Sequence, residues 1–205
     1  MKKVLALLGV VMFSASAFAL NTEAPAVKDC AGQKAAFEKY AVDQRNDFVA
    51  QHILINMADP MENMTDEQAL PIAACYATFK VKGTPFTNFV RAHAGVFPGD
   101  ITGKEKAEMN AFADRVERLS AQAKVNKMAQ AGNVSHTIEY ILINFADPMA
   151  KMSDVEAAPL AKAYAGVKVN GQPMLEFVRV HASEFPGTVG PELDAFVERV
   201  NKLDK

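Results

Sequence analysis

The chain has 205 residues, half of them apolar, and a formal net charge of −2 at pH 7. This charge gives the protein no electrostatic reason to bind nucleic acid or anionic lipid, and the length allows one large or two small hydrophobic cores. Beyond the N-terminus, no apolar stretch approaches the ~20 residues that a membrane helix needs, which predicts no integral membrane segment.

The N-terminus is typical of a secretory signal peptide. Lys2 and Lys3 precede an apolar run over residues 4–13, and residues 17–19 form an A-x-A cleavage pattern. We therefore predict a signal peptide over residues 1–19, cleaved after Ala19 or, alternatively, after Ala17. Removing the two lysines leaves 20 basic and 24 acidic residues, a charge of −4. The mature chain is expected to be soluble and exported, to a bacterial periplasm.

An internal repeat dominates the rest of the chain. Residues 53–99 reappear as residues 141–187, shifted by 88 positions, with 27 of 47 residues identical and no gap. A repeat of this length is a duplicated structural unit. We therefore predict one module over residues 20–120 and a second over residues 121–205.

The first helix of each copy follows from apolar spacing. In the second copy an apolar face recurs at spacings of four, three and four residues. The residues of this face are Val134, Ile138, Ile141 and Phe145. We expect the helix to stop near residues 144–148, because a proline disfavours helix in the residue before it.

Three further helices follow in each copy. Thr65 with Gln68, and Ser153 with Glu156, form capping boxes at the start of a second helix. Pro71 predicts a kink in that helix, or a start at the proline itself. Glycine then ends it, and a proline opens a third helix that runs to a Phe-Pro-Gly segment. The fourth helix carries an apolar heptad spacing in both copies: Met109, Phe112, Val116 and Leu119, and Leu193, Phe196, Val200 and Leu203.

These patterns predict an all-α protein, a tandem duplication of a roughly four-helix module behind a cleaved signal peptide. We find no convincing alternating pattern of a β-strand. Residues 120–130 contain no proline or glycine, so the connection between the modules is expected to be largely helical, with its break at Gly132 and Asn133. The modules pack side by side or lie on a semi-rigid connector.

The two cysteines, Cys30 and Cys75, are expected to form a disulfide in an oxidising compartment. The second copy has Ala163 in place of Cys75, so this bridge belongs to the first copy alone. It would attach the N-terminal segment to the module.

Histidine and arginine provide the first candidate binding residues. His93 and His181 lie on the apolar stripe of the third helix in each copy. Two readings stay open for them: a half-buried neutral ring hydrogen-bonded within the fold, or a pH-responsive or ligand-contacting group. Arg91 and Arg179 point elsewhere and serve a solvated face or an anion. No catalytic residue is assigned.

Methionine provides the candidate metal ligands. Thioethers are soft ligands suited to Cu(I), and exported copper proteins combine methionine with histidine. Methionine also fills irregular gaps in a core, and Phe145 in place of Met57 favours that packing role. The candidate copper ligands are His52, Met57, Met61, Met64, Met149 and Met152.

One segment of each copy resembles the last helix of class I cytochromes c. Residues 64–67 lead to Ala73-Ala74-Cys75-Tyr76-Ala77, and residues 152–154 lead to a similar Ala161-Lys162-Ala163-Tyr164-Ala165. In that family a methionine before this helix is an axial heme ligand. The chain has no C-x-x-C-H, so covalent heme attachment by the usual route is excluded and we transfer no heme role.

These observations favour a non-catalytic periplasmic protein that binds an unknown protein, a peptide or a small apolar ligand, with methionine and phenylalanine lining a groove between the copies. The same groove would also accept a second copy of the chain, which would make a homo-oligomer. The alternative is a periplasmic copper-handling protein, and the third hypothesis is an enzyme that uses His93 or His181 as acid and base. No cofactor other than copper is indicated.

Overall fold

The computed structural model describes residues 29–96, 103–131, 133–185, 187 and 189–205. The predicted signal peptide lies outside these residues. None of the described helices combines the length and the apolar character that crossing a bilayer requires.

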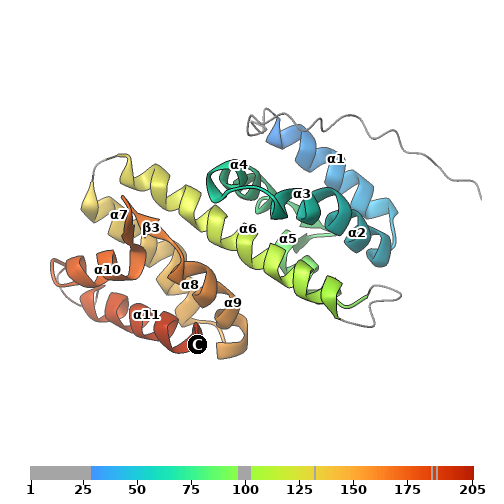
Figure 1. The fold of residues 1–205 in the computed structure, drawn as a ribbon. Helices are drawn as coiled ribbons and strands as arrows, with labels where there is room; N and C mark the ends of the chain where they lie inside the picture. Colours follow the sequence, from blue (N-terminus) through green and yellow to red (C-terminus); the bar gives the residue numbers. More distant parts are fainter. Residues whose placement is uncertain (1–28, 97–102, 132, 186, 188) are drawn as a thin grey trace, which may run out of the picture.

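The described chain is mostly helical, which confirms the all-α prediction in its coarse form (Figure 1). The first half contains α1 (Cys30–Asp43), α2 (Asn46–Ile53), the π-helical turn η1 (Leu54–Ala58), α3 (Asp59–Glu62), α4 (Asp66–Tyr76), β1 (Lys80–Val81), β2 (Thr84–Pro85), α5 (Phe86–His93) and α6 (Lys104–Ala129). The second half contains α7 (Val134–Ile141), η2 (Leu142–Ala146), α8 (Asp147–Ala150), α9 (Asp154–Ala165), β3 (Lys168–Val169), β4 (Gln172–Pro173), α10 (Met174–Ala182) and α11 (Val189–Leu203).

The first predicted helix does not stop at the Asp-Pro pair. In both halves it widens into a π-helical turn and continues through the proline as α3 or α8. A proline inside a helix clashes with the carbonyl four residues earlier and lacks an N–H donor. The wider turn just before Pro60 and Pro148 relieves that clash, so the helix survives.

The capping boxes at Thr65 and Ser153 are both present, and α4 and α9 begin at the next residue. Pro71 therefore lies inside α4, not at its start. The third predicted helix is shorter than expected, because α5 ends at His93 and α10 at Ala182.

Two short hairpins contradict the expectation of no strands. β1 pairs with β2, and β3 with β4, through antiparallel registers of two residues each. Lys82 and Gly83 between the first pair have φ values of 50° and 85°, and Asn170 and Gly171 have 50° and 86°. Positive φ at both central residues is the signature of a tight type I′ turn. The first hairpin links α4 to α5, and the second links α9 to α10.

The described core falls into two clusters that meet on α6. Val116 and Leu119 belong to the first cluster, while Val125 and Ala129 belong to the second. Figure 1 shows α6 running through the middle of the molecule, with first-half helices on one side and second-half helices on the other. The boundary between residues 120 and 121 stays a prediction, but the change of cluster falls at that point of the helix.

The second half of α6 plays the same part in its cluster as α1 plays in the other. Phe37 and Ala41 of α1 are buried, and the residues 88 positions later are Val125 and Ala129. A side chain of each helix also caps a strand edge: Glu38 Oε1 accepts from the Lys80 N–H at 2.8 Å, and Gln122 Oε1 from the Lys168 N–H at 2.7 Å. Each unit thus contains one helix beyond the four predicted for the repeat, and in the second unit this helix is the predicted helical connection.

The predicted disulfide is present. Cys30 and Cys75 join the start of α1 to the end of α4, with Cα atoms 5.7 Å apart. The helix that takes the place of α1 in the second half is held by its continuity with the rest of α6, so it needs no such bridge.

Candidate functional site

His93 lies at the end of α5 in a complete hydrogen-bond network. Its Nδ1 is 2.9 Å from the carbonyl oxygen of Phe89, and its Nε2 is 3.0 Å from Asn46 Nδ2. Since a carbonyl only accepts and an amide N–H₂ only donates, these contacts fit a neutral ring that carries its proton on Nδ1. Lys82 Nζ fixes Asn46 by donating to its Oδ1 at 3.2 Å. Both ring nitrogens are thus occupied within the fold.

His181 has different partners from His93. Its Nδ1 is 2.8 Å from Glu184 Oε1, three residues further along the chain. The residue that corresponds to Asn46 is Val134, which offers no polar group. The two histidines occupy the same repeat position, but their polar surroundings differ. Each ring contacts the phenylalanine one turn earlier: His93 stacks on Phe89, and His181 packs against Phe177.

Arg91 is largely buried and bound to carboxylates, whereas we predicted that it serves a solvated face or an anion. Its guanidinium makes a two-pronged contact with Glu117 at 2.7 and 2.8 Å and donates to Asp114 at 2.8 Å. Burial by itself lowers the pKa of Arg91, but the bonds to Glu117 and Asp114 outweigh it and the pKa is raised. Asp114 also pairs with Lys162 of α9 at 2.9 Å, which connects the two halves. An anion would have to displace these carboxylates.

Arg179, the counterpart of Arg91, is exposed and makes no hydrogen bond or ion pair among the described residues. The corresponding positions on α11 are Glu198 and Asn201, where α6 has Asp114 and Glu117. The bidentate contact with Glu117 therefore has no equivalent in the second half.

The candidate copper ligands lie mostly in the cores. Met57, Met61 and Met149 are buried in the two core clusters, and Met64 and Met152 pack against them. No group of three or more His, Cys, Asp and Glu side chains that could hold a metal ion occurs within the described ranges. This arrangement favours the packing role of methionine.

His52 packs between aromatic rings. Its ring centroid is 4.6 Å from that of Tyr40 and 6.2 Å from that of Phe37, and its Nδ1 lies 3.4 Å from Asn56 Nδ2. Burial lowers the pKa of His52 below its ordinary value of 6.5. The second half has Tyr140 at this position, so an aromatic ring is the common requirement.

We expect His52→Tyr to reduce the sensitivity of the protein to mild acid. Because the folded state disfavours the charged ring, the unfolded state binds more protons once the pH falls below about 6.5, and stability decreases through that range. Urea unfolding at pH 7.0 and 5.5 should show a smaller loss in the variant than in the wild type. An equal loss in both proteins would show that His52 does not cause the acid sensitivity.

The sequence did not single out Arg115 and Arg199, which clamp the same loop in the two halves. Arg115 donates to the carbonyl oxygens of Met61 and Met64, both at 2.6 Å, and to Asp66 Oδ1 at 3.1 Å. Arg199 donates to the carbonyl oxygens of Met149 and Met152 and to Asp154 in the same way. Each guanidinium thus joins the end of α3 or α8 to the start of the next helix. The sequence signal that could have revealed Arg115 and Arg199 is their matching position in the fourth helix of the two copies.

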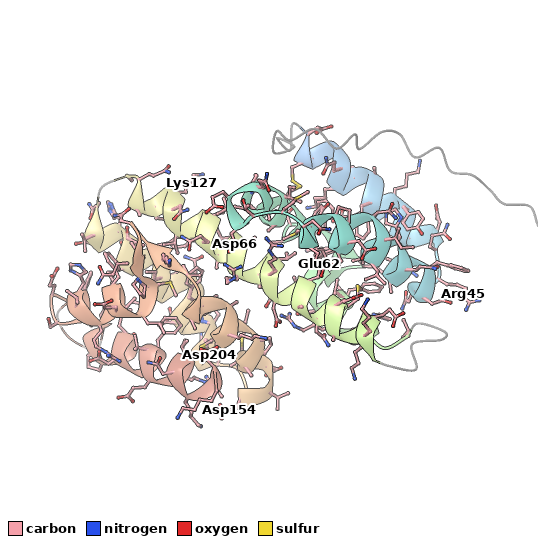
Figure 2. All side chains as sticks on the ribbon, in the orientation of Figure 1. Arg45, Glu62, Asp66, Lys127, Asp154 and Asp204 are labelled. Carbon is pink, nitrogen blue, oxygen red and sulfur yellow. A yellow bond between two sulfur atoms is a disulfide. The ribbon has the colours of Figure 1, made fainter. Side chains whose placement is uncertain are left out.

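Exposed apolar side chains lie on the helical segment that carries the π-turn. Phe48 and Ile55 are seven residues apart on α2–η1, two helical turns, and are 49% and 54% exposed. Ile143 of η2 corresponds to Ile55 and is 57% exposed. The Arg45 guanidinium stacks over the Phe48 ring, 5.4 Å from its centroid, at the outer end of the molecule (Figure 2).

Among the described residues, the methionines and phenylalanines expected to line a groove between the copies lie instead in the two cores, apart from Phe48 and the partly buried Met64, Met128, Met152 and Phe185. Comparison of the chain with protein-family models, with curated proteins and with solved structures found no match. The functional argument therefore rests on the surface of this molecule.

Proposed function

We propose that the protein is an exported, non-catalytic helical protein of the periplasm, built from two repeats, that binds a partner polypeptide. The observation that carries the proposal is the pair Ile55 and Ile143. These two residues occupy the same repeat position, and each is more than half exposed. A shared buried residue is needed for packing of the core, whereas the shared isoleucine faces water in both repeats and is free to contact a partner.

Charge supports a partner with apolar and basic side chains. The chain carries a net negative charge, and Asp59 follows Ile55 one turn later on the same helical segment. Protein interfaces combine an apolar centre with a polar rim, and complementary charge adds specificity and speed of association. Phe48 and Ile55 would provide the apolar centre in the first repeat.

The groups that carry acid–base chemistry support binding over catalysis. His93 and Arg91 direct their polar atoms to other groups of the chain, and the Nδ1 of His181 lies against Glu184. A general acid or base needs an atom within reach of substrate. No specific observation favours the copper-handling hypothesis over the packing role of the methionines.

A photo-crosslinking side chain placed at position 55 or 143 of the full exported chain tests this proposal. We expect both positions to yield the same crosslinked partner in the native cell. The control is position 155, because Val155 is 87% exposed and its counterpart in the first repeat is Glu67. With the crosslinker at position 55, Ile143→Arg should weaken capture, and with the crosslinker at position 143, Ile55→Arg should do the same, while each substitution changes stability by less than about 0.5 kcal/mol. Equal adducts at position 155, or capture from both positions that the arginine at the other position leaves unchanged, would contradict the proposal.

A further inference from the structure

A hollow of about 150 Å³ lies in the first half, between the η1–α3 segment and the N-terminal half of α6. Its apolar wall is made by Ala58, Met61, Ala111 and Phe112. A cavity of roughly this volume holds a molecule the size of benzene in another protein. The hollow therefore has room for a short aliphatic chain.

The rim of the hollow is acidic. Asp59, Glu62 and Glu108 border it, and Glu62 lies on the side of α3 that faces α6 (Figure 2). Asp59 and Glu62 are exposed. A ligand that fills the hollow thus meets an apolar wall and carboxylates at the mouth, which is the chemistry that suits an organic cation.

Arg115 also borders the hollow, but its charge is already taken up. Its guanidinium donates to the Met61 and Met64 carbonyl oxygens and to Asp66. These acceptors belong to the end of α3 and the start of α4. Arg115 therefore counters the cation less than an unpaired arginine would.

A lysine of the chain already illustrates this preference. Lys104 Nζ lies 3.1 Å from Glu108 Oε1. The hydrogen bond to Glu108 is the main cause that raises the pKa of Lys104, with smaller Coulomb contributions that include Glu105 and Glu62. The rim thus stabilises an ammonium group, and Lys104 competes with a cationic ligand for the same negative charge.

We propose that this hollow binds a lysine side chain of the partner polypeptide, with the aliphatic stem against Met61 and Phe112 and the ammonium at Glu62. The inference rests on the proposed function, because it names the chemistry by which that partner is recognised. The second half has Ala150 in place of Glu62, so the site belongs to the first repeat alone.

The test uses the mature protein and n-butylammonium, which has the stem and charge of a lysine side chain. Binding is followed by the NMR signal of the Met61 methyl group, and n-butanol is the neutral control. We expect n-butylammonium to bind about fivefold more tightly than n-butanol, as one screened ion pair provides. Glu62→Ala, the residue of the second half, should remove this preference, and Lys104→Gln should increase the affinity for the cation.

A capped peptide, acetyl-Gly-Lys-Gly-amide, separates a lysine side chain from a free amine. We expect it to shift the Met61 signal at least as readily as n-butylammonium does. Equal binding of n-butanol and n-butylammonium, indifference to Glu62→Ala, or exclusion of the peptide would each overturn the inference. Crosslinking from position 55 or 143 that persists in a protein without cation binding would leave the proposed function standing while this inference fails.

Discussion

Replacing both Cys30 and Cys75 with alanine is expected to lower the free energy of unfolding by about 4 kcal/mol. The bridge spans 45 residues, and closing a loop of this length restricts the unfolded chain by roughly that amount. Alanine is the residue that the second half has at the Cys75 position. Urea unfolding followed by circular dichroism measures the loss, and reduction of the wild type should reproduce it.

The loss should be uneven along the chain. Without the bridge, α1 is attached only through its packing and its connection to α2, so its amide protons should exchange faster. The second half of α6 occupies the corresponding place, yet it is continuous with the first half and should keep its protection. Faster exchange at both helices to the same extent would show that the bridge stabilises the whole molecule and not α1.

Substituting Arg115 by alanine is the second large effect that we expect, with a loss of about 2–3 kcal/mol. The substitution leaves the carbonyl oxygens of Met61 and Met64 without their charged donor and Asp66 without one partner. Arg199→Ala should act in the same direction in the second half. Arg115→Lys should restore little, because an ammonium cannot reproduce the planar fork of a guanidinium.

Arg179→Ala is the matched control, since that exposed arginine has no described partner. It should change the free energy of unfolding by less than about 0.5 kcal/mol. If Arg115→Ala were as mild as Arg179→Ala, the bonds to Met61 and Met64 would contribute nothing to stability.

The helical character of the chain, its capping boxes and its disulfide were predictable because each depends on local spacing or on compartment. The hairpins were missed because each strand has only two residues, too few to show an alternation of apolar and polar side chains. Their turns carried the only usable signal. Asn170-Gly171 is a strong signal for a type I′ turn, and its two flanking residues were the only strand evidence available.

The π-helical turns could not be predicted from spacing. Pro60 and Pro148 indicate an end of helix when the backbone is assumed to be a regular α-helix. The structure keeps the helix by adding one residue to the turn, and the Asn56 side-chain amide donates to the His52 carbonyl at the start of that turn. Asn144 does the same with Tyr140. The hydrogen bond from this asparagine to the carbonyl four residues earlier can be recognised only once the backbone of the π-helical turn is known.

The candidate site residues show the same division. The position of His93 on an apolar stripe predicted a half-buried ring, which is one of the two readings that the sequence left open. The partners of Arg91 could not be predicted, because Asp114 and Glu117 lie 23 and 26 residues away on another helix. Packing of α5 on α6 brings them together, and neither periodicity nor charge pattern fixes that pairing.

The double role of α6 makes the two halves thermodynamically dependent on each other. Unfolding the first half removes the N-terminal turns that α6 needs, so the Val125 side of the helix would have to persist as a shorter helix, which is less stable in water. The free energy of unfolding of one half therefore depends on whether the other half is folded, as in linear arrays of repeats. Cooperativity between the halves is therefore built into a single backbone element.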